Sequence, residues 1–369
     1  MADTLYFSRD TKVFVKIGSD IWEIPVLDGF SFSQATNASE ITLNEMSDTS
    51  GNSRRGRQMF TDSYAPAEWS FSTYARPYKS TGSGVGAADD TANTHHAVEE
   101  VLWALMVGDA SYSSFSFTGF TADTTDLDIV FTNSNKTTLG TADIFFVMGG
   151  AGSGTKTTYK IANCCVNEAS LDFDIDGIAT INWSGMGTII TEDSEPTATV
   201  TEAVSGTSNF IRNRLTSLTV TAADTTTYPG TGSGAYDLVL TGGNITISNN
   251  MTFLTPETLG VVNQPLGHVT GTRSVSGNFT CYLNAEANSS ADLFENIIEG
   301  TTTITNDFDL NFKIGGASGT PRIEMAMAAC HLEVPAHSID DVISLETNFH
   351  ALPSTIDGTD ELTIKYVGA

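Results

Sequence analysis

The sequence predicts a mainly β protein built from two β-sandwich units in tandem, each with one α-helix and one long loop between two strands. Three observations predict this class: apolar and polar residues alternate along many short segments, only two segments show a helical period, and similar blocks recur in the same order in both halves. A length of 369 residues suits two domains. We place the boundary in the polar stretch 192–208, which gives units at 1–200 and 201–369.

The expected strands alternate apolar and polar residues, so each has one core face and one solvent face. The clearest are 30–33, 69–72 and 171–176. The other strand candidates are bounded by Gly, Asn, Asp, Ser and Thr; they are 13–17, 21–26, 126–131, 144–148, 159–166 and 178–183 in the first half, and 215–220, 238–240, 245–248, 278–283, 308–314, 323–334, 342–349 and 362–367 in the second.

Two segments have the apolar spacing of an amphipathic helix. In residues 98–106 apolar side chains recur at i, i+3, i+4, i+7 and i+8, with Asn93 or Thr94 as N-cap and Gly108 as the C-terminal stop. The second, residues 289–300, begins with a serine that can cap it and ends at a glycine. Each half of the chain is therefore expected to carry one helix.

The two halves also share an order of blocks that indicates an internal duplication. Residues 29–33 match 244–248 in alternation, and residues 70–74 match 278–282. The two helices follow, and 176–181 then matches 340–345. Each unit also contains a loop of about twenty residues, a length that is uncommon without a function. These loops are 47–65, which carries Arg54, Arg55 and Arg57, and 255–274, which carries Arg273.

Composition excludes several classes of function. The formal charge of −27 argues against binding nucleic acid by neutralising phosphates, which needs clustered Lys and Arg. A hydrophobic content of 40% is too high for a disordered acidic chain. The longest apolar run is far shorter than a membrane helix, and no export signal is expected at the N-terminus. The cysteines lack metal-site spacing, so buried reduced thiols are expected at Cys164, Cys165, Cys281 and Cys330.

Two motifs resemble ligand sites, and both have a simpler interpretation. The glycine-rich segment 149–157 precedes a strand rather than a helix, which favours a turn over a phosphate loop. Asp172, Asp174 and Asp176 match the opening of a calcium loop, but the closing Glu is absent because Trp183 holds that position. A strand with three carboxylates on its solvent face is favoured. No catalytic motif is present, so neither an enzyme, a metal nor a cofactor is expected.

This layout resembles the tail tube protein (major tail protein) of long-tailed bacteriophages. The resemblance is carried by residues 29–33, the loop with its three arginines, the returning strand 69–74 and the late hairpin at 176–177. In that family, subunits usually form hexameric rings that stack into a tube, and their strands merge into one β-barrel. A chain with two such domains implies a homotrimer with pseudo-sixfold symmetry.

The resemblance also implies the location and partners of the protein. It would be a structural virion protein of the tail tube, made in the host cytoplasm. Its partners would be other copies of itself and other tail proteins, namely the tape measure, tail terminator and distal tail proteins. Viral DNA would pass through without specific binding during ejection.

From the resemblance and the alternating pattern we expect a set of polar residues to line the lumen. They are Ser31, Ser33, Ser70, Ser72, Asp172, Asp174 and Asp176 of the first unit, and Thr246, Ser248, Thr280, Ser344 and Glu346 of the second. The loop residues expected to contact a neighbouring subunit or ring are Arg54, Arg55, Arg57 and Arg273. An alternative is an extracellular or surface-layer β-sandwich protein that binds calcium, at Asp172 to Asp176, or carbohydrate.

Overall fold

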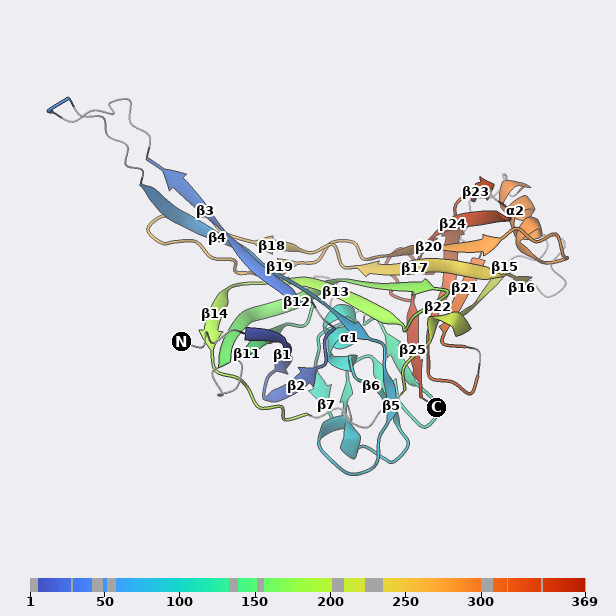
Figure 1. The fold of residues 1–369 in the computed structure, drawn as a ribbon, viewed down its shortest axis with the longest axis horizontal. Coiled ribbons are helices and arrows are strands. Elements are labelled where there is room, and N and C mark those ends of the chain that lie inside the picture. The colour runs from blue at the N-terminus through green and yellow to red at the C-terminus, as the bar shows by residue number, and fades with distance from the viewer. Residues whose placement is uncertain are drawn as a thin grey trace.

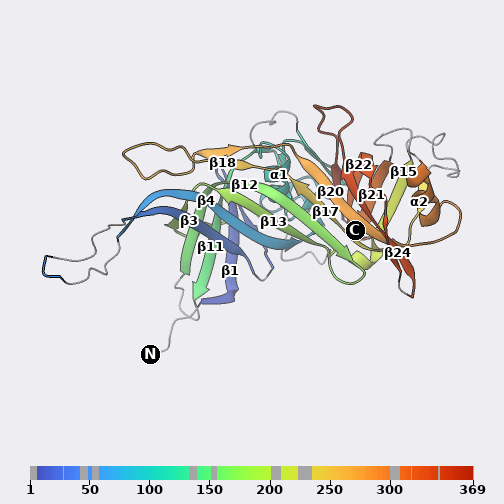
Figure 2. The same cartoon turned by 90° about the horizontal axis from the view of Figure 1, so that it is seen from above.

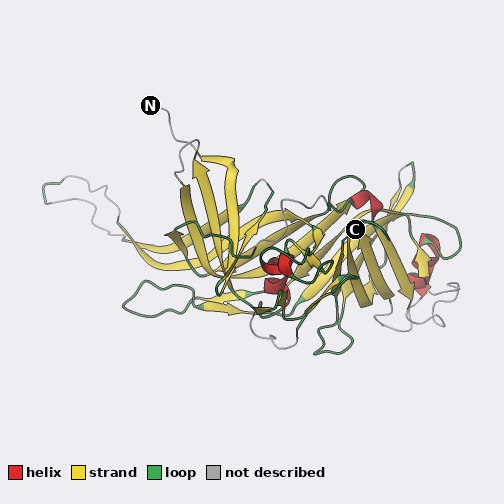
Figure 3. Cartoon of the chain, turned by 90° about the horizontal axis from the view of Figure 1, so that it is seen from below, coloured by secondary structure: helices red, strands yellow, loops and turns green. Residues whose placement is uncertain are grey.

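The predicted mainly β class is confirmed (Figure 1). The structure, a computed structural model, describes residues 6–27, 29–41, 49–51, 58–132, 139–150, 156–200, 209–222, 235–299, 308–316, 318–339 and 341–368. Figure 3 shows the few helices among the many strands. None of the helices in these ranges is long and apolar enough to cross a membrane.

One antiparallel sheet, here called the central sheet, runs through both halves of the chain. The halves meet where β12 pairs with β17, with Asp172 opposite Asn244. The order of its strands is β3 (Ser31–Glu40), β4 (Met59–Tyr74), β13 (Thr180–Gly187), β12 (Lys156–Asp174), β17 (Leu240–Ser248), β20 (Ser274–Tyr282), β24 (Ile343–Ala351) and β23 (Ala336–Ile339).

Two further sheets flank the central sheet, and long strands pass from them into it. The first contains β2 (Asp20–Ile24), β1 (Tyr6–Ile17), β11 (Ala142–Gly150), the start of β12 and β14 (Ile190–Asp193). The second contains β16 (Ala235–Asp237), β15 (Ser217–Ala222), β21 (Phe308–Ile314), β22 (Arg322–Leu332), β25 (Thr363–Val367), β10 (Leu127–Val130) and β9 (Phe120–Ala122). Because β10 pairs with β25, the halves are joined a second time near the C-terminus.

Three small hairpins complete the strands. They are β5 (Pro77–Lys79) with β6 (His95–Ala97), β7 (Tyr112–Ser113) with β8 (Ser116–Phe117), and β18 (Thr252–Leu254) with β19 (Gly267–Val269). A strand, β12, follows the glycine-rich segment as expected and pairs antiparallel with β11; residues 151–155 lie outside the described ranges.

The two halves have the same pattern of strand pairing. In the first, β1 pairs with β2 and β11, and the order then runs β11, β12, β13, β4, β3. In the second, β15 pairs with β16 and β21, and the order runs β21, β22, β24, β20, β17. The helix lies between β4 and β11 in the first chain segment, and between β20 and β21 in the second.

The first helix differs from the expectation. α1 spans Glu100–Val107 with Glu99 as its N-cap, so the expected start at Val98 and the caps at Asn93 or Thr94 were wrong. The chain before it forms β6, which pairs with β5. All eight helical residues are buried, so α1 is packed on all sides and is not amphipathic. This is possible because Trp103, Ala104 and Val107, which lie outside the predicted apolar face, are also apolar. The second helix, α2 (Ser290–Glu299), is confirmed.

The core lies on the apolar face of the central sheet. The ring of Trp103 on α1 packs edge-on against Trp183 of β13, with centroids 4.8 Å apart. Trp183 Nε1 donates to Thr73 Oγ1 at 2.9 Å, and Trp103 Nε1 donates to the hydroxyl of Tyr366 at 2.7 Å. Both polar atoms are therefore satisfied while their rings are buried. All four cysteines are buried and free, as expected.

Glycines opposite aromatic residues recur in the central sheet. Gly185 faces Trp69, Gly243 faces Phe173 and Gly277 faces Phe349 on the neighbouring strands. A Cβ at any of the three glycines would lie within 2.4 Å of a backbone oxygen and within 2.8 Å of the opposing ring. The rings thus cover the bare backbone, and glycines in such positions allow a sheet to bend.

The two long loops are shorter than expected. β4 begins at Met59, so residues 59–65 extend a ladder with β3 instead of forming a loop. In the second loop, residues 267–269 form β19, which pairs with β18 just before the loop, and residue 274 already belongs to β20. Figures 1 and 2 show both strand pairs projecting in the same direction from the body. Arg54, Arg55 and Arg57 lie outside the described residues.

Candidate functional site

The solvent face of the central sheet is one continuous polar surface, here called the polar face. Strand register aligns its residues in rows that cross both halves. One row contains Ser31, Ser70, Ser184, Glu168, Ser248 and Ser274; the next contains Ser72, Asn182, Ser170, Thr246, Ser276 and His350; a third contains Asp172, Asn244, Asn278 and Asn348. The alternate residues face the core and are mostly buried, including Trp69, Leu171 and Ile245.

The structure brings most of the predicted lumen residues together on this face. They are Ser31, Ser33, Ser70, Ser72, Asp172, Asp174, Thr246, Ser248, Thr280, Ser344 and Glu346. Asp176 is placed differently, because β12 ends at Asp174 and Asp176 lies in the turn that follows. There its carboxylate pairs with Arg214 at 3.5 Å, and both side chains are exposed.

Hydrogen bonds between side chains link neighbouring strands of the polar face. The carboxylate of Asp172 accepts from the amides of Asn182, at 3.4 Å, and Asn244, at 3.5 Å, one from each half of the chain. Near the far end of the sheet, Asn348 Nδ2 donates to Glu333 at 2.8 Å and His350 Nε2 lies 3.3 Å from the same carboxylate. These two hydrogen bonds lower the pKa of Glu333.

The charged groups of the polar face are acidic. Beside Asp172, Asp174 and Glu346, the face carries Glu68, Glu168 and Glu333, which sequence reasoning missed. No Lys or Arg occurs in the described strands where they form the central sheet. The signal for Glu68 and Glu168 was present, because each lies two residues before a serine already on this face.

Both outer edges of the central sheet are open. Within the described part of the chain, β3 pairs only with β4 and β23 pairs only with β24. Every residue of β23 is exposed. An open edge presents unpaired backbone groups that can bind another strand.

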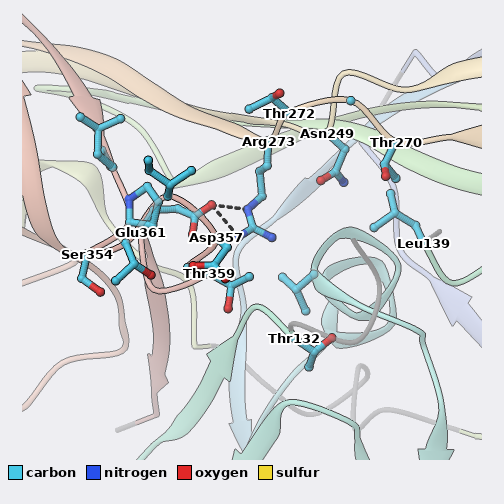
Figure 4. Close-up of a pocket in the computed structure, with 18 residues that line it drawn as sticks. Thr132, Leu139, Asn249, Thr270, Thr272, Arg273, Ser354, Asp357, Thr359 and Glu361 are labelled. Atoms are coloured by element: carbon cyan, nitrogen blue, oxygen red, sulfur yellow. Dashed lines mark hydrogen bonds and ion pairs between the residues drawn. The ribbon is translucent and has the colours of Figure 1, made fainter. Parts of the chain in front are cut away.

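Arg273 lies in a pocket beside this sheet, close to the start of β20 (Figure 4). The pocket has a volume of about 780 Å³ and is lined by residues 270–273, 351–359 and 361 with parts of α1 and the chain around β10. The Arg273 guanidinium pairs with Glu361 Oε1 at 2.5 Å and lies 3.7 Å from the centroid of Phe131. The other carboxylate oxygen of Glu361 is buried and has no hydrogen-bond partner among the described residues.

A separate group of ionisable residues is buried around α1. Burial raises the pKa of Glu99 to about 7, although the Tyr366 hydroxyl donates to it at 2.5 Å. Nearby, His96 lies 3.1 Å from Glu100 and 3.2 Å from Asp90 through its two ring nitrogens. Burial lowers the pKa of His96, but the hydrogen bonds and charges of the two carboxylates outweigh it and leave a raised pKa. These residues connect α1 to the preceding loop.

The arrangement offers no evident site for metal chemistry. In the described ranges, no three His, Cys, Asp or Glu side chains are grouped so that they could hold a metal ion. Asp172 and Asp174 are separate points along a strand, and Asp176 points to Arg214. Burial also raises the pKa of Cys165, to about 12, so its contact with His268 at 3.0 Å leaves a thiol and not a thiolate.

Comparison with known proteins identifies relatives over nearly the whole chain. The family model described as "Phage tail tube protein" matches residues 27–351. The chain is also 30% identical over 373 aligned positions to the tail tube protein pb6 of Escherichia phage T5, and the match covers 97% of this chain and 75% of that protein. The matched segment contains all eight strands of the central sheet.

Proposed function

Because this chain belongs to the phage tail tube protein family, whose role is structural and whose place is the virion tail, we propose that three copies of it close into a ring. Stacking of these rings would build the tube. Each ring would have six similar units, two from each chain. The tube would serve as an acidic conduit for DNA during ejection, and the protein would not be an enzyme.

The open edges of the central sheet support ring closure. β3 of one copy would pair with the β23 edge of the next, as β17 pairs with β12 inside the chain. The pairing would be antiparallel in both cases, so the polar face would continue from copy to copy. Closure would also remove both exposed edges, which otherwise favour uncontrolled association.

The shared pairing pattern supports the proposal that the two halves are copies of one unit, with a boundary near residue 200. Corresponding strands pair in the same order, and each helix occupies the same place in that order. The two copies are no longer equivalent in detail, since α1 is entirely buried while Ile298 on α2 is 44% exposed. A ring of three chains therefore has pseudo-sixfold symmetry.

The size of the resulting barrel suits a duplex. Eight strands from each of three chains give 24 strands. With strands about 4.8 Å apart and tilted by roughly 40°, the backbone diameter is about 48 Å, and side chains reduce the bore to roughly 40 Å, against about 20 Å for duplex DNA.

The single observation that carries the proposed function is the continuous acidic polar face. If it faces the lumen, carboxylates such as Asp172, Glu168 and Glu346 repel phosphates, and no described cation on that face can retain them. Hydroxyl and amide groups provide a hydrated wall between the charges. Asp176, which is exposed in the turn after β12, would lie at the rim of this surface.

Electron microscopy of the purified protein tests the assembly, and phage carrying charge-reversal variants test the conduit. We expect stacked rings with a bore of roughly 40 Å. Asp172→Lys combined with Asp174→Lys should still assemble, because both side chains are exposed, but should lower infectivity at least tenfold. A matched surface variant outside the central sheet, Glu192→Lys combined with Glu286→Lys, should assemble and keep wild-type infectivity. Monodisperse particles stabilised by calcium would instead support the surface-layer alternative, and unchanged infectivity of the double variant would refute the acidic conduit.

The partners follow from the same premise. A tail tube protein assembles with itself and with other components of the tail. We propose that the latter are the tape measure, terminator and distal tail proteins, and that the chain is made in the host cytoplasm before assembly.

A further inference from the structure

A contact inside the chain shows how the long loop of one unit docks on the preceding unit. The loop between β17 and β20 bends back so that Asn263 pairs with Ser63 of β4. The Tyr64 amide donates to the Asn263 carbonyl at 2.9 Å, and the Asn263 amide donates to the Asp62 carbonyl at 3.1 Å. Figure 1 shows the hairpin β18–β19 lying beside β3 and β4.

The edge of β4 that accepts Asn263 is free because β13 stops short of it. β13 ends at Gly187, opposite Ala67, and β3 occupies the other edge of β4. In the second unit β24 ends in the same way at Ala351, opposite Val275 of β20. Ala67 and Val275 therefore occupy corresponding places, 208 positions apart in the sequence. The same shift makes residues 270–272 the counterparts of residues 62–64.

At residues 270–272 the structure has a pocket instead of a docked loop. This is the pocket of Arg273, bounded on the β24 side by the chain that follows Ala351. Figure 4 shows Arg273 and Glu361 beside Asp357 and Thr359 at this place. None of residues 270–272 forms a β-bridge, whereas Ser63 at the corresponding place in the first unit pairs with Asn263.

The pocket carries acidic groups that suit a basic occupant. Glu361 is 5% exposed, and its Oε2 has no partner although Arg273 occupies Oε1. Asp357 adds a second, exposed carboxylate at the mouth. A buried carboxylate oxygen without a donor is costly, and a guanidinium supplies several donors at once.

The occupant can be named from the same correspondence. The shift of 208 positions takes Asn263 back to position 55, within the loop that joins β3 to β4. That loop carries three of the chain's few cations, Arg54, Arg55 and Arg57. The loop therefore carries the positive charge that would balance the acidic groups of the pocket.

We propose that the Arg273 pocket receives the β3–β4 loop of the neighbouring copy in the same ring, with an arginine of residues 54–57 donating to Glu361 Oε2 and Asp357. This proposal rests on the ring proposed above. It assigns the arginine loop to a lateral contact within one ring. From the sequence alone, the loop could contact either a neighbouring subunit or a neighbouring ring.

Disulfide trapping in assembled tubes tests the lateral contact. A chain with both Arg55→Cys and Thr272→Cys carries one new cysteine in the β3–β4 loop and one at the pocket, so each can meet its counterpart on a neighbouring copy. The four native cysteines are buried. After oxidation, non-reducing gels should show linked dimers and trimers and nothing larger, because a ring contains three chains. Ladders beyond three would place the loop in the next ring, and tubes without any linked chains would refute the contact. If the unmodified protein forms no rings, the proposed function itself fails.

Charge removal provides a second measurement if the double-cysteine chain does not assemble. Asp357→Asn removes an exposed carboxylate at the pocket, and Glu192→Gln removes an exposed carboxylate on β14, outside the central sheet, as a matched control. Rings of the first variant should dissociate at about half the salt concentration that dissociates wild-type rings, because screening weakens the remaining ion pairs. Rings of the control should match the wild type. Equal salt resistance of both variants would refute the role of the pocket.

Discussion

Replacement of Gly277 by alanine should strongly destabilise the central sheet. Gly277 lies on β20 between Ile245 of β17 and Phe349 of β24. A Cβ at this position would lie 2.0 Å from the carbonyl oxygen of Asn244 and 2.8 Å from the ring of Phe349. An ordinary contact is about 3.4 Å, so β17 and β20 would have to separate by roughly 1 Å or more, which breaks the hydrogen bonds of the ladder locally.

The size of the effect follows from these two contacts. Two weakened ladder hydrogen bonds cost about 1 kcal/mol each, and crowding of Phe349 costs about 1–3 kcal/mol. We therefore expect a loss of about 3–5 kcal/mol in the free energy of unfolding, which lowers the melting temperature by roughly 10 °C for a unit of this size.

Urea denaturation of unassembled subunits, followed by tryptophan fluorescence, measures this loss. Gly267→Ala is the matched control, since Gly267 lies in β19, a Cβ added there would meet no atom within 4 Å, and the backbone is not left-handed at this residue. The control should unfold at the wild-type urea concentration. If Gly277→Ala unfolded together with Gly267→Ala, the glycine–aromatic pairs would not be required by the packing.

Three other perturbations have defined outcomes. Glu99 has a folded-state pKa of about 7 against an ordinary 4.5. Its contribution to stability is therefore complete below pH 4.5 and is lost as the pH rises through 7. Glu99→Gln should flatten that part of a plot of melting temperature against pH. Gln34→Ala should lower the free energy of unfolding by about 1–3 kcal/mol in urea titrations, because the Gln34 side chain donates to the carbonyls of Ala65 and Thr188 and accepts from the amide of Ile190; a loss below about 0.5 kcal/mol would contradict this. The native protein should resist maleimide at pH 7 and react at four thiols in urea, because burial raises the pKa of Cys165 to about 12 and the other three cysteines are also buried. Rapid labelling of the native protein, measured by mass spectrometry, would contradict this and show that the core around the thiols opens readily.

The polar face was predictable from sequence because it depends on a local rule. Alternation along a strand assigns Ser70 and Asp172 to the solvent side without knowledge of their neighbours. The order of the strands was not predictable, since the junction of β12 with β17 pairs residues about seventy to eighty positions apart. Where alternation stops was also uncertain, and Asp176 was assigned to a strand that ends two residues earlier.

Burial of charge was hidden from the sequence for a related reason. Glu99 and Glu100 stand at the start of an apolar helix and suggest that this start is exposed to solvent, yet both are buried. The partner of Glu99 is Tyr366, which lies 267 positions away in the sequence, whereas Glu100 pairs locally with His96. Likewise, the pocket at Arg273 exists only because the segment after β24 returns to the start of β20. Contacts of this kind depend on tertiary arrangement and leave no periodic signal.

The junction between β12 and β17 has a consequence for the kinetics of assembly. In the proposed ring of three chains, three of the six lateral junctions would form while each polypeptide folds, at a rate that does not depend on subunit concentration. Only three would remain to form between chains, so closing the ring would remove the translational and rotational freedom of two bodies instead of five. Covalent linkage of the two halves would thus lower the order of the nucleation reaction and fix the alternation of first and second units around every ring.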